Sequence, residues 1–233
     1  MQVKTTVLLI LMVGITVSAV SINTNHANSI TSFKTVEMPV VLGNTSYGYV
    51  ERGGPYGNIS SSVKIAYITG VHPLESGAHD AILEALLTNQ QSMRYCYYIY
   101  RVHVTQDAAD YDKGRINGQN LAYKYVVPDV ESMGLAVDVH SNRGLYREKI
   151  FLDVPVNDAA SEKYAFEMVQ ETPWLAFYIP PWDKGPTSGS YVILPLINSG
   201  IPTFVYETYT YQPYNTTLSQ DREFVENLDK IAL

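Results

Sequence analysis

Short apolar runs alternate with polar segments along the chain, and the apolar positions in these runs follow strand or helix spacing. Runs rich in β-branched and aromatic residues predict strands at 33–41, 46–51, 63–69, 93–105, 134–140, 148–154 and 203–206. Apolar residues at helical spacing predict helices over 77–87, 159–171 and 218–233. A short helix or strand is expected at 191–198.

Polar segments rich in Gly, Pro, Asn and Ser separate these elements. We expect a turn at Gly43 and Asn44, and loops over 52–62, 106–120 and 172–190. The 106–120 loop is long for a compact domain, and such loops are usually functional or mobile.

Strands that alternate with helices, several of them without period-two alternation, predict an α/β fold. We expect a mixed, mostly parallel central sheet with helices on both faces. The length of 233 residues fits one domain, which we place at 33–233.

The N-terminus has the pattern of an export signal. Lys4 precedes an apolar stretch at 7–20, and Val17, Ser18 and Ala19 are small residues suited to cleavage. We interpret 1–20 as a signal peptide or an uncleaved N-terminal anchor, and 21–32 as a polar spacer. Export to the cell surface or the medium is therefore expected. Sequons at Asn44, Asn58 and Asn215 are compatible with it.

Composition narrows the function classes further. The net charge of −7 argues against a nucleic-acid-binding surface. Cys96 is the single cysteine of the chain and cannot form an internal disulfide, and its apolar run predicts a buried residue. The 19 tyrosines indicate either a wet, adhesive surface or compositional drift.

Titratable residues stand at the ends of separate predicted strands. His72 and Glu75 follow the strand 63–69, His140 ends the strand 134–140, and Glu207 follows the strand 203–206. Such strand ends tend to converge at one edge of an α/β sheet. Two histidines and one carboxylate are a ligand set of hydrolytic Zn²⁺ sites, which leaves Glu207 as a general base.

Each of these residues also has a structural interpretation. His72 and Glu75 could cap the following helix, His140 could be a hydrogen-bonded strand-end histidine, and Glu207 could be an isolated ion-paired carboxylate. Asp138 either orients His140 or is a plain structural carboxylate. The remaining histidines of the predicted domain, His79 and His103, are interpreted as structural.

The segments around these residues, at 68–79 (ITGVHPLESGAH), 136–142 (AVDVHSN) and 203–209 (TFVYETY), resemble known sequences. They are similar to the M14 zinc metallocarboxypeptidases, nearest their aspartoacylase and succinylglutamate desuccinylase branch. The resemblance implies zinc held by His72, Glu75 and His140, with Glu207 as base, in a twisted mixed sheet.

Substrate-binding residues are carried over less directly. The family's Asn-Arg pair has a counterpart here only in reversed order, as Arg115 and Asn117. Arg143, beside Asn142, is a second candidate, because either arginine could bind a carboxylate through two parallel hydrogen bonds. A late-loop tyrosine, Tyr191 or Tyr209, is expected to help. Pro73 replaces a common glycine, and Glu75 and His140 are separated by only 140 − 75 = 65 positions.

These observations favour an exported zinc-dependent metallopeptidase or amidohydrolase. Its expected substrate is a peptide or acylated amino acid with a free carboxylate, and cell-wall peptide suits the export signal. Membrane contact is expected only through an uncleaved N-terminus. The alternatives are a non-catalytic surface protein of the same fold that binds wall polymer or peptide, and a metal-binding sensor or chaperone. Metals other than zinc also accept nitrogen and oxygen ligands.

Overall fold

The computed structural model describes residues 38–181 and 187–233. The predicted signal segment, the spacer and the beginning of the strand at 33–41 lie outside the described residues, and so do residues 182–186 of the predicted 172–190 loop. Within the described residues, no helix is both long and apolar enough to cross a membrane. The asparagines of all three sequons are exposed.

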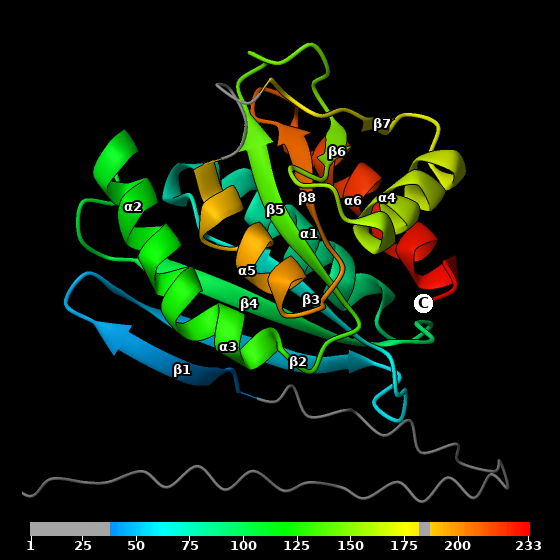
Figure 1. Ribbon diagram of the computed structural model, residues 1–233, viewed down its shortest axis with the longest axis horizontal. Coiled ribbons are helices and arrows are strands. Elements are labelled where there is room, and N and C mark those ends of the chain that lie inside the picture. Colours follow the sequence, from blue (N-terminus) through cyan, green and yellow to red (C-terminus); the bar gives the residue numbers. More distant parts are fainter. Residues whose placement is uncertain (1–37, 182–186) are drawn as a thin grey trace, which may run out of the picture. The chain divides into compact units, whose positions relative to one another are not determined.

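One eight-stranded sheet runs through the domain (Figure 1). Its spatial order is β1 (Val40–Thr45), β2 (Gly48–Gly57), β4 (Cys96–Val104), β3 (Lys64–Thr69), β5 (Leu135–Asn142), β8 (Thr203–Tyr209), β6 (Phe151–Asp153) and β7 (Ala176–Phe177). The four central strands β4, β3, β5 and β8 are parallel, whereas β1 pairs antiparallel with β2 and β2 with β4. At the other edge, β6 pairs antiparallel with β8 and parallel with β7. This confirms the predicted mixed, mostly parallel sheet.

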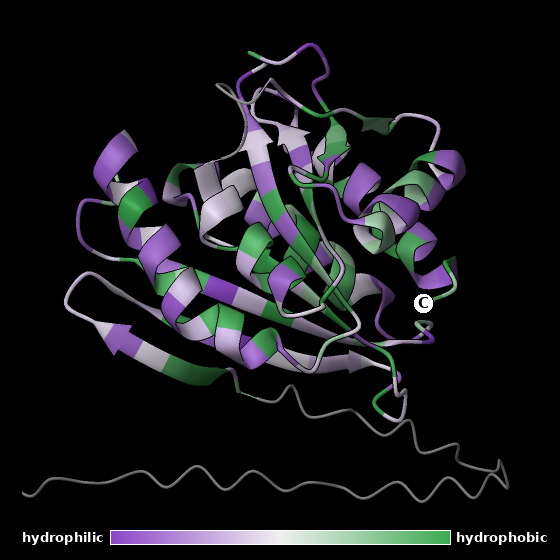
Figure 2. Ribbon diagram, viewed as in Figure 1, coloured by the Kyte–Doolittle hydropathy of each residue, from purple (hydrophilic) through white to green (hydrophobic). Residues whose placement is uncertain are grey.

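Helices cover both faces of the sheet, and each face has its own apolar cluster. On one face lie α1 (Ser76–Asn89), α4 (Ala159–Glu171) and α6 (Tyr214–Lys230); on the other lie α2 (Tyr111–Leu121), α3 (Val127–Val130) and α5 (Ile193–Asn198). Short helical segments occur at η1 (Pro73–Glu75), η2 (Ala122–Val126, which joins α2 to α3) and η3 (Thr187–Ser190). Figure 2 shows many hydrophobic residues along the central strands, interrupted by a few hydrophilic ones, and many hydrophilic residues on the helices.

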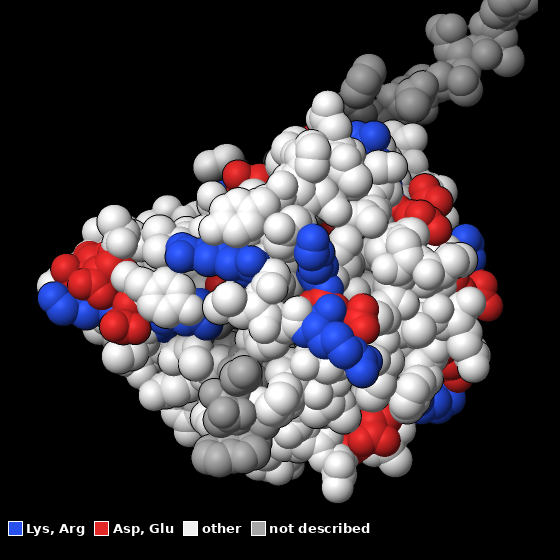
Figure 3. All heavy atoms as spheres, turned by 90° about the horizontal axis from the view of Figure 1, so that it is seen from above, with Lys and Arg blue, Asp and Glu red and all other residues white. Residues whose placement is uncertain are grey.

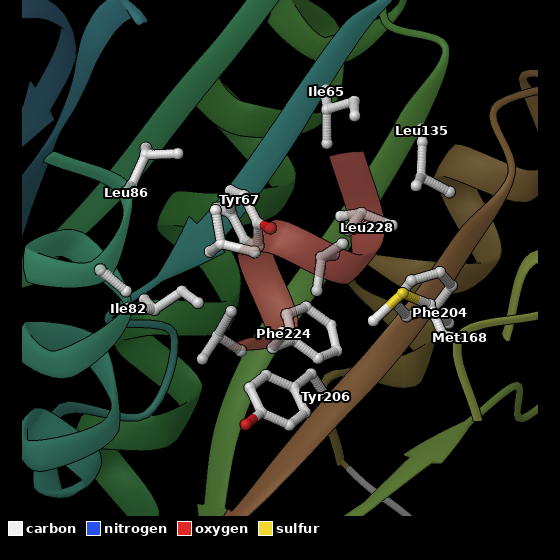
Figure 4. Close-up of a cluster of buried hydrophobic side chains, with 14 of the residues drawn as sticks. Ile65, Tyr67, Ile82, Leu86, Leu135, Met168, Phe204, Tyr206, Phe224 and Leu228 are labelled. Carbon is white, nitrogen blue, oxygen red and sulfur yellow. The ribbon is translucent and has the colours of Figure 1, made fainter. Parts of the chain in front are cut away.

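The core beneath α6 contains aromatic residues with polar atoms (Figure 4). The rings of Tyr206 and Phe224 stack at 4.1 Å between centroids, and both side chains are fully buried. The Tyr206 hydroxyl donates a hydrogen bond of 2.8 Å to Oδ1 of Asp221, while Oδ2 of Asp221 has no partner among the described residues. A carboxyl group is therefore enclosed in an otherwise apolar cluster.

The segment predicted as a loop at 106–120 is mostly helical, so this prediction was wrong. Asp110 caps α2 by accepting hydrogen bonds from the backbone N–H groups of Asp112 and Lys113. Gly118 lets α2 pack against the chain after β3, since a Cβ at this position would lie 2.1 Å from the carbonyl oxygen of Val71. The two glycines of α2 lower its intrinsic helix propensity, but this tertiary contact requires one of them.

The predicted loop at 52–62 was wrong in its first half. β2 continues to Gly57, with an irregular register against β4 between Gly53 and Tyr56. Gly43 and Asn44 belong to β1, so the β1–β2 turn falls at positions 46–47 instead. The predicted strands at 63–69, 93–105, 134–140, 148–154 and 203–206 are confirmed, as are the helices, and Cys96 is buried as expected. The strand predicted at 33–41 overlaps β1 only at 40–41 among the described residues.

Candidate active site

The loop after β3 carries the first two candidate ligands. Gly70 ends the strand at φ +80°, where a Cβ would lie 2.1 Å from the carbonyl oxygen of Val102. Pro73 then begins η1, where its missing N–H costs nothing, and Glu75 ends it. This tight turn places Nδ1 of His72 3.1 Å from Oε1 of Glu75.

His140 joins these residues from the neighbouring strand β5. Its Nδ1 lies 2.9 Å from Oε2 of Glu75, and its ring centroid lies 4.3 Å from that of His72. One ligand atom from each of His72, Glu75 and His140 lies within 4.8 Å of the others. Both Nδ1 atoms therefore face one carboxylate, a donor set that fits a divalent metal ion such as Zn²⁺.

The protonation of this cluster follows from burial and from the neighbouring charges. Burial, together with the charge of His140, lowers the pKa of His72 to about 4. Burial opposes ionisation of Glu75, but the hydrogen bonds and charges of His140 and His72 hold its pKa well below the usual range. A neutral His72 beside an ionised Glu75 is the state that a metal ion requires of its ligands.

The other ring nitrogen of His140 is also contacted. Oδ2 of Asp138 lies 2.9 Å from Nε2 of His140, and the Ser188 hydroxyl lies 3.2 Å from it. Asp138 is fully buried. Burial disfavours the charged ring, but the charges of Asp138 and Glu75 raise the pKa of His140 well above its usual range, so a metal ion at Nδ1 would displace a proton there while Asp138 holds the one on Nε2.

Glu207 lies beside this cluster in the next strand. It is the register partner of His140 in the β5–β8 pair, and only 5% of its surface is exposed. Burial raises its pKa to about 8, with the charge of His140 opposing the rise. Its Oε2 lies 3.4 Å from the amide nitrogen of Asn142. A carboxylate with a pKa near neutrality suits the role of general base.

A cavity of about 500 Å³ opens over these groups and has the size of a small-molecule site. Its lining residues are His72, Pro73, Leu74, Glu75, Asp110, Tyr111, Arg115, Ser141, Asn142, Arg143, Leu145, Tyr146, Thr187, Glu207 and Thr210. Arg115 and Arg143 line it beside the acidic Glu75, Asp110 and Glu207, and we call it the cationic cavity after its two arginines. Figure 3 shows this end of the domain, where Lys and Arg side chains lie around acidic atoms near the centre.

The two arginines flank one aromatic ring. The guanidinium carbon of Arg115 lies 4.9 Å from the ring centroid of Tyr111, and that of Arg143 lies 5.7 Å from the same centroid. Arg115 also contacts Oε1 of Glu75 at 3.2 Å and the hydroxyl of Thr187 at 3.1 Å. Tyr111 thus supports two cations at the cavity wall.

The other predicted substrate residues are placed differently. Asn142 lines the cavity, but its amide donates to the carbonyl oxygens of Lys149 and Thr208, both at 2.9 Å. Asn117 and Tyr191 do not line it. The amide of Asn117 donates to the carbonyl oxygen of Gln106, and Tyr191 packs against the apolar cluster under α5.

Several residues of the site were missed from the sequence. Gln119 lies 3.2 Å from Nε2 of His72 and 2.7 Å from the hydroxyl of Thr187, so it supports the first ligand from α2. Tyr111 and Tyr146 line the cavity. The capping residue Asp110 was the one available signal, because it marks the start of the helix that carries Tyr111, Arg115 and Gln119.

Several solved structures have a fold similar to that of this chain. A putative metallopeptidase from Shewanella denitrificans matches with a TM-score of 0.55 at 10% identity, covering 82% of both chains. The fold is that of the metallocarboxypeptidases. The mDAP-bound form of Csd4 from Helicobacter pylori, a D,L-carboxypeptidase, matches with a TM-score of 0.55 at 13% identity, over 75% of this chain and 52% of that one.

A third match belongs to the aspartoacylase and succinylglutamate desuccinylase branch, which the sequence motifs also resemble. The succinylglutamate desuccinylase/aspartoacylase from Rhodobacter sphaeroides gives a TM-score of 0.50 at 14% identity, over 78% of this chain and 57% of that one. The present chain therefore spans about half the length of this protein and of Csd4. No protein-family model matches the sequence, and neither does any curated protein.

Proposed function

We propose that the protein is an exported zinc-dependent metallopeptidase or amidohydrolase that cleaves an amide bond next to a carboxylate-bearing group. One observation carries this proposal. The ligand atoms of His72, Glu75 and His140 gather within 4.8 Å, and the buried Glu207 lines the same cavity as His72 and Glu75. A metal-binding structural site has no need of a second, buried carboxylate beside it.

Each residue of the site would have its own role in the reaction. Zn²⁺, when held by Nδ1 of His72, Nδ1 of His140 and the carboxylate of Glu75, supplies polarisation of the scissile carbonyl and a lower pKa for water. Glu207 takes the proton from the attacking water and returns it to the leaving amine. Asp138 holds His140 in the tautomer that presents Nδ1.

The substrate class follows from the cavity wall. Arg115 and Arg143 are two guanidinium groups that can bind a carboxylate, and the geometry of a guanidinium suits that ion. A peptide or acylated amino acid with a free carboxylate is therefore the substrate class proposed here. A cell-wall stem peptide fits best with the predicted export signal, and the likeness to the mDAP-bound Csd4 fold supports it.

The first test is metal content by mass spectrometry on the purified chain, with His140→Ala beside the wild type. About one zinc per wild-type chain, lost in the variant, is expected. A folded wild type that holds no stoichiometric metal after zinc is added back would refute the hydrolase.

Catalysis is tested next, on N-acyl amino acids and wall peptides with release of new amine as readout. Glu207→Gln keeps the metal in this proposal but loses turnover. A non-catalytic binding protein instead predicts peptide binding with no amine release by the wild type. Export is tested by N-terminal sequencing of the secreted chain, which should begin near position 20.

A further inference from the structure

A second cavity adjoins the cationic cavity and has no role so far. Its volume is about 250 Å³, and its lining residues are Leu74, Glu75, Gly77, Ala78, Ser141, Thr208, Tyr209, Thr210, Gln212, Tyr214 and Thr217. Leu74, Glu75, Ser141 and Thr210 also line the cationic cavity, so the two cavities share a wall. We call the second one the neutral cavity.

The shared wall is formed by the metal-ligand region itself. The backbone N–H of Ser141 donates a hydrogen bond of 3.0 Å to Oε2 of Glu75, and the hydroxyl of Thr210 donates one of 3.0 Å to that of Ser141. Ser141 and Thr210 line both cavities, so they lie where the neutral cavity adjoins the metal-ligand region. The neutral cavity is the space beyond them.

The chemistry of the two cavities differs. Among the described residues, Glu75 is the only charged side chain that lines the neutral cavity, and its carboxylate is already bound by His72 and His140. The other polar groups are hydroxyls and one amide, with the rings of Tyr209 and Tyr214 beside them. Such a lining accepts an uncharged group with aromatic or hydroxyl character, whereas burying a charged one there would cost free energy.

We infer that the neutral cavity binds the acyl side of the substrate, as a single uncharged residue that precedes the scissile bond. This inference rests on the proposed function, because it takes the carboxylate-bearing leaving group to occupy the cationic cavity. The small volume suits one residue rather than a longer chain, since sites for drug-sized ligands begin at about 300 Å³. The favoured substrate then has a neutral acyl residue joined to an anionic leaving residue.

Gly77 offers a way to fill the cavity without disturbing the metal ligands. It lies in the first turn of α1, and a Cβ there meets nothing within 4 Å. Because Gly77 lines the cavity and its Cβ would meet open space, we expect Gly77→Leu to extend a side chain over the cavity. Asp80→Leu is the matched control, because Asp80 is exposed on the same helix and lines neither cavity.

The experiment compares zinc-loaded wild type, Gly77→Leu and Asp80→Leu on four substrates: acetyl-Glu, acetyl-Tyr-Glu, acetyl-Lys-Glu and acetyl-Asp-Glu. In the wild type, kcat/KM for the Tyr substrate should exceed that for the Lys and Asp substrates at least tenfold. In Gly77→Leu, the ratio of kcat/KM for acetyl-Tyr-Glu to that for acetyl-Glu should fall at least tenfold, chiefly through KM. In Asp80→Leu this ratio should stay within twofold.

Equal use of charged and neutral acyl residues would overturn the inference, and so would an unchanged ratio in Gly77→Leu. If the wild type hydrolyses none of the four, the proposed function fails and the same peptides are measured by calorimetry for binding. If the wild type then binds acetyl-Tyr-Glu more tightly than acetyl-Glu, and Gly77→Leu does not, the neutral cavity is still a binding site for the acyl residue. Equal binding of the two peptides by the wild type would refute the inference.

Discussion

The enclosed carboxyl of Asp221 should make the stability of this protein depend on pH far from the active site. Burial raises the pKa of Asp221 to about 7 from its ordinary value of 3.8, although the hydrogen bond from Tyr206 lowers it in part. Between these two values the unfolded chain has lost this proton and the folded chain still holds it. The folded state therefore binds more protons there, and its stability falls as the pH rises.

The size of the effect follows from the shift. A pKa difference of about 3 units corresponds to about 4 kcal/mol, at about 1.4 kcal/mol per unit. Asp221→Asn removes the titration while keeping an oxygen that accepts from the Tyr206 hydroxyl. The variant should thus be close to wild type near pH 4 and more stable than it by a few kcal/mol at pH 8.

Urea denaturation of both proteins, followed by circular dichroism at half-unit steps from pH 4 to 8.5, measures this directly. The quantity of interest is the difference in free energy of unfolding, because the other titrating groups, including the buried Asp153, are common to both proteins. A difference that does not change between pH 4.5 and 7.5 would show that Asp221 is already ionised in the folded state, and would refute the reasoning.

Three further outcomes are expected. Glu207→Gln should lower kcat by about 10²- to 10⁴-fold with metal content unchanged, measured by steady-state kinetics with mass spectrometry; an active variant would remove Glu207 as base. Tyr111→Leu should raise KM for carboxylate substrates several-fold by releasing both guanidinium groups, while Tyr111→Phe keeps the ring and the wild-type KM. Gly118→Ala should destabilise the fold by about 1–3 kcal/mol in urea denaturation, because its Cβ would meet a backbone oxygen at 2.1 Å. Gly77→Ala, with open space around its Cβ, should be neutral or stabilising, and equal effects of the two glycine variants would contradict this packing argument.

The central strands and the core of the site could be predicted because both depend on simple patterns. Apolar runs marked β3, β4, β5 and β8, and residues at the ends of parallel neighbours meet at one edge of the sheet. That rule was enough to bring His72, Glu75, His140 and Glu207 together. It requires no knowledge of how the helices pack.

The rest of the site depends on tertiary contacts that leave little trace in the sequence. α2 is polar and contains two glycines, so its composition is that of a loop, and only its packing against Val71 explains Gly118. Because α2 was missed, so were Tyr111 and Gln119. β2 was cut short for the same reason, since its Gly- and Pro-containing half is held as a strand by β4.

The ligands of the candidate metal site come from the loop after β3 and from β5, which are distant in the chain. His72 and His140 are 140 − 72 = 68 positions apart, and they meet only after β3 and β5 have paired side by side. A metal ion bound by both histidines would link these two segments reversibly, and the unfolded chain has no preformed site for it. Its binding energy is then also folding energy, about 4 kcal/mol at a thousandfold excess of free metal over its Kd. Metal supply would in this way raise the stability of the central sheet.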